Sequence, residues 1–291
     1  MVFAVYACYR GIMILFENEH AQARCLWVAG EHLYAGWSWT DDDERGNELT
    51  ILDAGGALVR TWKLRYLVSD VAVVGDRCFA ALGPGELAVW PSRGLQGEPT
   101  VAQVDANAPT FAVHGDTLMW GTSWGEIHDL DRGLIANVKK SLTDIAIDGQ
   151  RIYAAYEDGK VRVFSRDGKS VKVLAAGKKA IRCSLAGDTL VTVDARSGDT
   201  ISWSTTGFEK RAAFVRDSHG ADYGVIGVGL YAQYIVSRTF DDVEIHDREG
   251  KLVGAWRSPE GNIEDVWPDD RGLIIAAGSR VYRVMQADLR A

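Results

Sequence analysis

The stretch IAIDGQRIYAAY, residues 145–156, consists of two short apolar runs separated by a polar turn at Gly149. The same phrase recurs along the 291-residue chain, with turns that follow one another at steps of 45, 40, 34, 38, 45 and about 38 residues. A period near 40 residues indicates that one supersecondary unit repeats along the chain. The seven copies are Leu26–Gly36, Val71–Leu82, Phe111–Thr122, Ile145–Tyr156, Cys183–Asp194, Val228–Thr239 and Val266–Ala277.

The remainder of each period contains two more strands. In the fourth copy an alternating run, Lys160–Phe164, is followed by the turn Arg166-Asp-Gly168 and by a fourth predicted strand, Lys169–Leu174. Alternation over four to six residues predicts a half-buried strand, and the glycine in the turn supplies the positive φ that a tight hairpin needs. No segment shows helical spacing over three turns. The sequence therefore predicts an all-β chain of seven antiparallel sheets, each with four strands.

The two ends of the chain complement one another. The last copy stops after its third strand, near Met285, whereas the N-terminal segment contains two additional strands, Phe3–Tyr9 and Ile12–Phe16. Joining the ends removes exposed sheet edges, which favours a closed ring. We expect Ile12–Phe16 to supply the missing strand because its spacing to Arg24 matches that of Ser170–Leu174 to Arg182. The predicted fold is a seven-bladed β-propeller, one domain over residues 1–291, with residues 1–20 contributing to ring closure.

This periodicity and hydrophobic pattern resemble the WD40-like β-propellers over essentially the whole chain. Trp90 and Trp203 occupy the tryptophan position of the third strand, but Pro91 and Ser204 stand where the family has aspartate. The sequence is therefore similar to a divergent member, nearer to the quinoprotein-like relatives. The resemblance implies a rigid scaffold whose loops bind other proteins.

Composition limits the class of protein. The longest apolar runs have the length of a strand, far below the about 20 residues that a membrane-spanning helix needs. The first residues, MVFAVYACYR, have neither a basic leader nor a small-residue cleavage site, so we do not interpret them as a signal peptide. The four cysteines lie on predicted strands without paired spacing. We expect a cytoplasmic protein with reduced, buried thiols, no metal site and no cofactor.

Charge is unevenly distributed. The net charge is −8, which argues against general nucleic-acid binding. Residues 131–182, however, contain 12 Lys or Arg and 6 Asp or Glu, for a net charge of +6. This section includes Lys139 and Lys179 near its ends and is either a docking side for an acidic partner or nucleic acid, or an outer strand whose lysines protect its edge. The second interpretation is favoured.

The loops between second and third strands contain aromatic residues beside charges, which suits a protein-recognition surface. In propellers these loops share one face with the loops that link the blades. Packing between blades is the alternative role for the tryptophans, since large aromatic side chains are mostly buried. The candidate partner-binding residues are Trp37, Trp39, Asp42, Trp124, Glu126, Tyr156, Arg196 and Phe240.

Acidic residues and histidines give little support to catalysis. Asp70, Asp144 and Asp265 each precede the first strand of a blade, where an aspartate ordinarily accepts hydrogen bonds from nearby backbone amides. The tetrapeptides Glu126–Asp129 and Glu244–Asp247 place histidine beside aspartate, but adjacent strand residues point to opposite faces. No nucleophile elbow, Walker sequence, zinc-protease motif or dinucleotide fingerprint is present.

Two functional classes follow. The first is a non-catalytic scaffold that binds a protein or peptide through the loop-bearing face. The alternative is an enzyme, or a protein that binds a small ligand or metal, in which the central channel forms the site.

Overall fold

The computed structural model describes residues 8–9, 12–40, 45–104, 110–179, 181–215, 227–231, 234–268 and 271–285. These residues form 29 strands and no helix. They group into two compact units, one from residues 1–109 and 258–290 and the other from residues 110–257.

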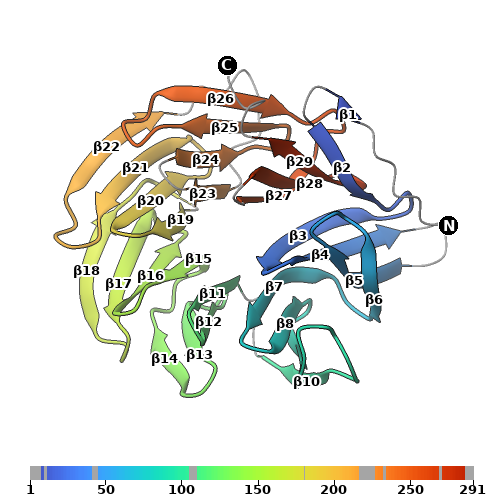
Figure 1. Ribbon diagram of the computed structural model, residues 1–291. Coiled ribbons are helices and arrows are strands. Elements are labelled where there is room, and N and C mark those ends of the chain that lie inside the picture. The colour runs from blue at the N-terminus through green and yellow to red at the C-terminus, as the bar shows by residue number, and fades with distance from the viewer. Residues whose placement is uncertain are drawn as a thin grey trace. The chain divides into compact units, whose positions relative to one another are not determined.

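The first unit contains three antiparallel sheets, drawn in blue to teal and dark red in Figure 1. One sheet consists of β3 (Gln22–Ala29), β4 (His32–Thr40), β5 (Arg45–Asp53) and β6 (Leu58–Leu64). The next consists of β7 (Val68–Val74), β8 (Arg77–Leu82), β9 (Glu86–Trp90) and β10 (Thr100–Gln103). The third consists of β27 (Ile263–Pro268), β28 (Gly272–Ala277) and β29 (Arg280–Met285), followed by β2 (Ile12–Glu17) and β1 (Cys8–Tyr9).

The second unit contains four sheets of four strands each. Their strands are, in order, β11 (Thr110–His114), β12 (Thr117–Gly121), β13 (Glu126–Asp129) and β14 (Gly133–Asn137); β15 (Leu142–Ile147), β16 (Arg151–Tyr156), β17 (Lys160–Ser165) and β18 (Ser170–Ala175); β19 (Ile181–Ala186), β20 (Thr189–Asp194), β21 (Asp199–Ser204) and β22 (Lys210–Val215); β23 (Gly227–Tyr231), β24 (Tyr234–Arg238), β25 (Asp242–His246) and β26 (Leu252–Arg257). In Figure 1 the first strands of successive sheets lie beside one another, and β15 contacts both β11 and β19.

Strand β2 completes the sheet at the C-terminal end of the chain. It pairs antiparallel with β29, with Ile12 opposite Val284 and Ile14 opposite Tyr282. This confirms the prediction that Ile12–Phe16 supplies the missing fourth strand. Strand β1 adds a short fifth strand through Cys8 and Tyr9, and the rest of the predicted strand Phe3–Tyr9 lies outside the described residues. The seven sheets confirm the predicted all-β propeller of four-stranded antiparallel blades.

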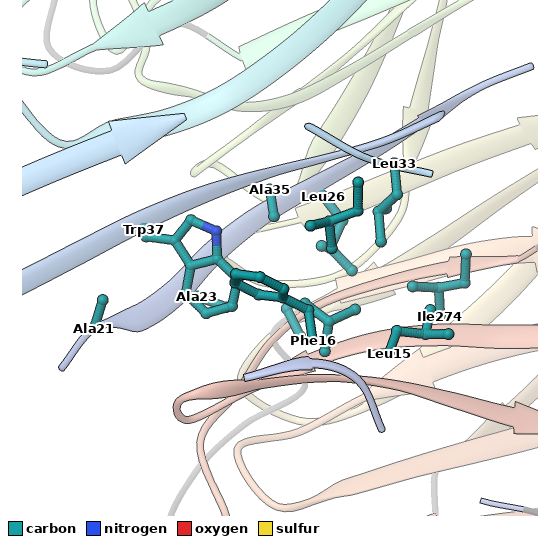
Figure 2. Packing of buried hydrophobic residues seen from close by; sticks show 12 residues of the cluster. Leu15, Phe16, Ala21, Ala23, Leu26, Leu33, Ala35, Trp37 and Ile274 are labelled. Carbon is teal, nitrogen blue, oxygen red and sulfur yellow. The ribbon is translucent and has the colours of Figure 1, made fainter. Parts of the chain in front are cut away.

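The core consists of apolar layers between successive sheets. The second strand of a sheet is covered on both faces, so β20 and β28 are buried at every residue. Between β2, β4 and β28, Phe16 packs against Trp37 with ring centroids 5.4 Å apart, and Figure 2 shows the two rings beside Ala23 and Leu26. Small residues such as Ala35 and Ala276 allow the sheets to approach closely.

The fourth strands lie on the outside. Strand β10 is exposed at all four residues, and a strand this short gives little alternating pattern in the sequence. In the repeated phrase, the turn glycines Gly30, Gly75, Gly115 and Gly187 adopt positive φ between 56° and 60°, and Gly149 does not. The turns of the last two copies, at Ala232 and Asp270, lie outside the described residues.

Candidate functional site

Five loops of the second unit lie at the same end of its strands and contact one another in series. Each is either the loop between a second and a third strand or the link from one sheet to the next. Antiparallel pairing places both kinds at one end, because the strand before each of these loops runs toward that end. We call this series the loop row and define it as residues 122–126, 138–141, 156–160, 176–179 and 194–199.

Backbone hydrogen bonds join neighbouring loops of the row. The Val138 N–H donates to the Gly125 carbonyl at 3.1 Å, and the Glu157 N–H donates to the Ser141 carbonyl at 3.0 Å. The Ala176 and Gly177 amides then both donate to the Gly159 carbonyl. Main-chain groups therefore hold the first four loops of the row together.

Two glycines make this close approach possible. Gly125 has a φ of +85° and Gly159 a φ of +79°, a region that side chains disfavour. A Cβ on Gly125 would lie 2.3 Å from the Lys140 carbonyl oxygen, and a Cβ on Gly159 would lie 2.3 Å from the Gly177 carbonyl oxygen. Both positions therefore require glycine for conformation and for space.

Asp194 anchors the far end of the row. Its Oδ2 accepts hydrogen bonds from the Lys178 and Lys179 amides, and its Oδ1 accepts from the Arg196 and Ser197 amides. Burial of Asp194 opposes ionisation, but the four backbone donors outweigh it, so the pKa of this carboxyl lies below its usual value. One buried carboxylate thus positions the loop that presents two lysines.

A shallow pocket of about 510 Å³ lies at the other end of the row. Trp124 is the most exposed large apolar side chain among the described residues, with 67% of its surface accessible. Lys139 and Lys140 come from the link between β14 and β15, and Lys139 itself has a φ of +55° with its amide donating to Asn137 Oδ1. The pocket is lined by Ser123, Trp124, Glu126, Asn137, Lys139, Lys140 and Ser141.

Glu126 has two polar partners in this pocket. Its Oε2 lies 3.1 Å from His128 Nε2, and its Oε1 accepts a hydrogen bond from Asn137 at 3.0 Å. The His128 ring in turn stacks on Trp120, with centroids 5.3 Å apart. Residues two apart on a strand share a face, so Glu126 meets His128, whereas the adjacent Asp129 points to the opposite face.

The charges exposed along the row are mostly positive. Its exposed anion is Glu157, and the other carboxylates are engaged: Glu126 as above, Asp158 with Arg162, Asp194 with backbone amides and Asp199 with Ser197. The exposed cations are Lys139, Lys140, Lys160, Lys178, Lys179 and Arg196. The predicted basic section therefore divides between this row and the outer edge, where Lys169 and Lys172 lie beside and on β18.

The predicted partner-binding residues differ in burial and in position. Trp37 and Tyr156 are fully buried, so both pack in the core as the alternative interpretation of the aromatic loops foresaw for tryptophan. The Arg162 guanidinium lies 4.6 Å from the Tyr156 ring centroid. Glu126 and Trp124 meet in the pocket described above, and Arg196 is exposed at the other end of the row.

The remaining candidates lie elsewhere. Phe240 is 38% exposed in the loop between β24 and β25. Trp39, in the first unit, is partly buried opposite Gly46 and lines a pocket of about 390 Å³ together with Arg24. Asp42 lies outside the described residues.

Two of the recurring aspartates, Asp144 and Asp265, join neighbouring blades. A register shift precedes each of them, as it precedes Asp70. Asp144 Oδ2 accepts from the Cys183 amide at 3.0 Å, and Asp265 Oδ2 accepts from the Leu26 amide at 2.8 Å. Asp70 accepts from its neighbour, the Val71 amide. Backbone hydrogen bonding, the predicted role, is confirmed for all three.

The described residues contain no group of three or more His, Cys, Asp or Glu side chains placed to hold a metal ion. Nor does any helix in the described part of the chain have the length and apolar character needed to cross a membrane.

Comparison with known proteins bears on the fold. No protein-family model and no curated protein matches the sequence. Among solved structures, this protein is similar to a chain in the crystal structure of the mitotic checkpoint complex. The two share 12% identity with a TM-score of 0.73, and the match covers 98% of this chain and 99% of that chain. This protein is also similar to the WD40 β-propeller domain of Doa1, with 13% identity, a TM-score of 0.72, and coverage of 96% and 99%.

The chain is also similar to BamB from Moraxella catarrhalis, with a lower TM-score of 0.60. The identity is 17%, and the match covers 89% of this chain and 81% of that chain. Likeness at such identities concerns the fold. Together with the seven sheets, it shows that this chain has a divergent WD40-like β-propeller fold.

Proposed function

We propose that this protein is a non-catalytic interaction scaffold that binds a protein or peptide through the loop-bearing face of a propeller. One observation carries the proposal: backbone hydrogen bonds and the Asp194 carboxylate join the loops of three successive sheets into the loop row, which presents exposed side chains on that frame. A frame of this kind loses little conformational entropy when a partner binds.

The side chains on the frame suit protein recognition. Trp124 exposes a large apolar ring beside charged and amide groups, which is the composition of an energetic anchor in protein interfaces. A ring this exposed contributes little to the core and is accessible to a partner. The WD40-like fold is consistent with this role. We further propose that the seven blades act as one domain over residues 1–291 in the cytoplasm.

The other class, an enzyme or small-ligand protein, gains no specific support from the described residues. The carboxylates that recur around the blades are bonded to backbone amides, as shown above for Asp144 and Asp265. A structural role accounts for their recurrence.

Site-specific photo-crosslinking tests the proposal. A photoreactive amino acid is placed at Arg196 or at Trp124 on the loop row, and as a control at Gln150 in the exposed turn between β15 and β16, at the opposite end of the strands. In native lysate we expect the row positions to crosslink to a distinct protein that the Gln150 position does not reach. Equal crosslinking from both ends of the strands, or none from the row, would contradict the proposal.

Trp124→Ala gives a separate prediction. We expect the melting temperature to stay within about 2 °C, because a residue that is two-thirds exposed makes few core contacts. Capture of the crosslinked partner is expected to fall by about 10-fold. Leu134→Ala is the matched control, since Leu134 is 54% exposed at the start of β14, away from the row. A large loss of thermal stability in Trp124→Ala would instead assign this ring to the core.

A further inference from the structure

We propose that the loop row binds an acidic peptide segment that carries an apolar side chain for the Trp124 pocket. This inference rests on the proposed function and specifies the chemistry of the partner. It is carried by the distribution of exposed charge: the row presents six exposed cations and one exposed carboxylate, whereas its other four carboxylates are buried or half-buried and hydrogen-bonded, in a protein whose net charge is −8.

The cations of the row lie in equivalent places of neighbouring blades. Lys139 and Lys140 precede β15, and Lys178 and Lys179 precede β19, which contacts β15. Each pair therefore occupies the same structural position one blade apart. Val138, next to the first pair, donates to the Gly125 carbonyl, and the Lys178 and Lys179 amides donate to Asp194, so the two pairs form a fixed array rather than two independent tails.

This placement differs from edge protection. Lysines that protect a sheet lie on its outer strand, as Lys172 does on β18. Interblade links contain no unpaired strand edge, so four lysines there have no such task. They remain solvated in the free protein and available to carboxylates of a partner.

The pocket next to Lys139 and Lys140 explains why an apolar side chain is expected among the acidic ones. The Trp124 ring supplies apolar surface, while Asn137 and Ser141 supply polar groups that suit a peptide backbone. Glu126 lies in the same pocket and repels anions there, so we expect the apolar side chain of the peptide in this pocket and its acidic side chains at Lys178 and Lys179. An acidic peptide therefore fits better than a nucleic acid, whose backbone repeats a phosphate at every nucleotide.

Fluorescence anisotropy with the full chain tests the inference. The probes are a labelled peptide of Glu and Asp residues around one Leu, the same peptide with Gln and Asn in place of the acids, and a single-stranded RNA. We expect the acidic peptide to bind at least about 10-fold more tightly than the neutral peptide and the RNA at low salt. Its affinity should fall as the ionic strength rises from about 50 mM to about 300 mM.

Two double variants with the same change of charge locate the site. Lys178→Glu with Lys179→Glu reverses charge on the row, whereas Lys169→Glu with Lys172→Glu reverses it at the outer edge of the same unit. We expect the first to weaken binding of the acidic peptide by about 10-fold or more and the second by less than about 3-fold. Trp124→Ala should weaken binding of the Leu-containing peptide and leave a peptide with Gly in place of Leu unaffected.

Each outcome decides the question. Equal binding of acidic and neutral peptides, equal effects of the two double variants, or tighter binding of RNA that depends on Lys178 and Lys179 would overturn the inference. Crosslinking of a protein to the row together with no affinity for the acidic peptide would reject the acidic partner and leave the scaffold proposal standing. Binding of the acidic peptide without any crosslinked protein would support the surface chemistry and count against the scaffold role.

Discussion

At the scale of single residues, the structure shows how few side chains position the loop row. Asp194 accepts four backbone hydrogen bonds while almost fully buried, and it connects the end of β20 to the link before β19. A carboxylate in this setting acts as a structural anchor, because each amide that it satisfies would otherwise lack a partner in that turn. Its effect on function comes through the lysines whose amides it holds.

Asp194→Asn tests this anchor. The amide side chain has one oxygen instead of two and presents an N–H group to backbone donors, so we expect a loss of about 2 kcal/mol in the free energy of unfolding at pH 7. Urea denaturation measures it. Asp131→Asn is the control, since Asp131 is exposed in the turn after β13, and a change within about 0.5 kcal/mol is expected there. Similar losses in the two variants would contradict the anchoring role.

The same variant carries a pH dependence. The pKa of Asp194 is lowered in the folded protein, so its ionised form contributes stability above the unfolded value of about 3.9. That contribution disappears as pH falls through the folded pKa, where the carboxyl becomes protonated. The difference between the native protein and Asp194→Asn should therefore be full near pH 6 and shrink below about pH 4. A difference that grows toward low pH would show that the sign is wrong.

At the scale of elements, glycines and the closing strand determine how loops and sheets meet. Gly159 and Gly187 both have positive φ, but their surroundings differ: a Cβ on Gly159 meets the Gly177 carbonyl at 2.3 Å, and a Cβ on Gly187 meets nothing within 4 Å. The pair therefore separates the cost of backbone conformation from the cost of lost space.

We expect Gly187→Ala to lower the free energy of unfolding by about 1 kcal/mol, the cost of a left-handed conformation for a residue with a Cβ. Gly159→Ala adds a steric clash with backbone and should cost about 2 kcal/mol more. It should also loosen the link that carries Lys178, which hydrogen–deuterium exchange of residues 176–179 would report. Equal losses in the two variants would show that the close approach at Gly159 has no energetic consequence.

Strand β2 contributes more than its edge pairing. Phe16 is 5% exposed and packs on Trp37 across the space between two sheets. We expect Phe16→Ala to cost about 3–5 kcal/mol through the lost contacts and the cavity that remains. Leu252→Ala is the control on an outer strand, where Leu252 is 41% exposed, and should cost about 1 kcal/mol or less. Thermal denaturation of both variants measures the difference, and comparable losses would remove β2 from the core.

At the scale of the whole molecule, both units have interiors that exclude solvent. Cys25 and Cys78 are buried in the first unit and Cys183 in the second, and all three are free thiols. Burial raises the pKa of each thiol, which removes the reactive thiolate as well as access to it.

Thiol labelling followed by peptide mass spectrometry therefore reports both interiors at once. In native buffer we expect Cys25, Cys78 and Cys183 to react about 10³-fold or more slowly than an exposed thiol, because labelling requires a large local opening. A cysteine introduced at the exposed Thr206 provides the reference rate. Rapid labelling at Cys183 with protection at Cys25 and Cys78 would show that the second unit opens independently.

The amino-acid sequence by itself determined the repeat, the all-β class and the use of Ile12–Phe16 as the closing strand. Alternation, turn glycines and spacing are local signals that need no knowledge of distant contacts. The bounds of β10 could not be predicted in this way, because a strand of four exposed residues shows no alternation of apolar and polar positions. The sequence also indicated that the recurring aspartates bond to backbone amides, although not that the amides for Asp144 and Asp265 belong to the next blade.

Only the tertiary structure decided which aromatic and charged residues reach the surface. Trp37 and Trp124 look alike as loop aromatics, yet one is fully buried and the other is 67% exposed, because the first belongs to a core cluster that also contains Ile274 and Ala276 from β28, near the C-terminal end of the chain. Lys139 and Lys178 are 39 residues apart, and only the stacking of β15 on β19 places their loops in one row. Burial and proximity arise from contacts between segments that are remote in sequence, and no local pattern contains that information.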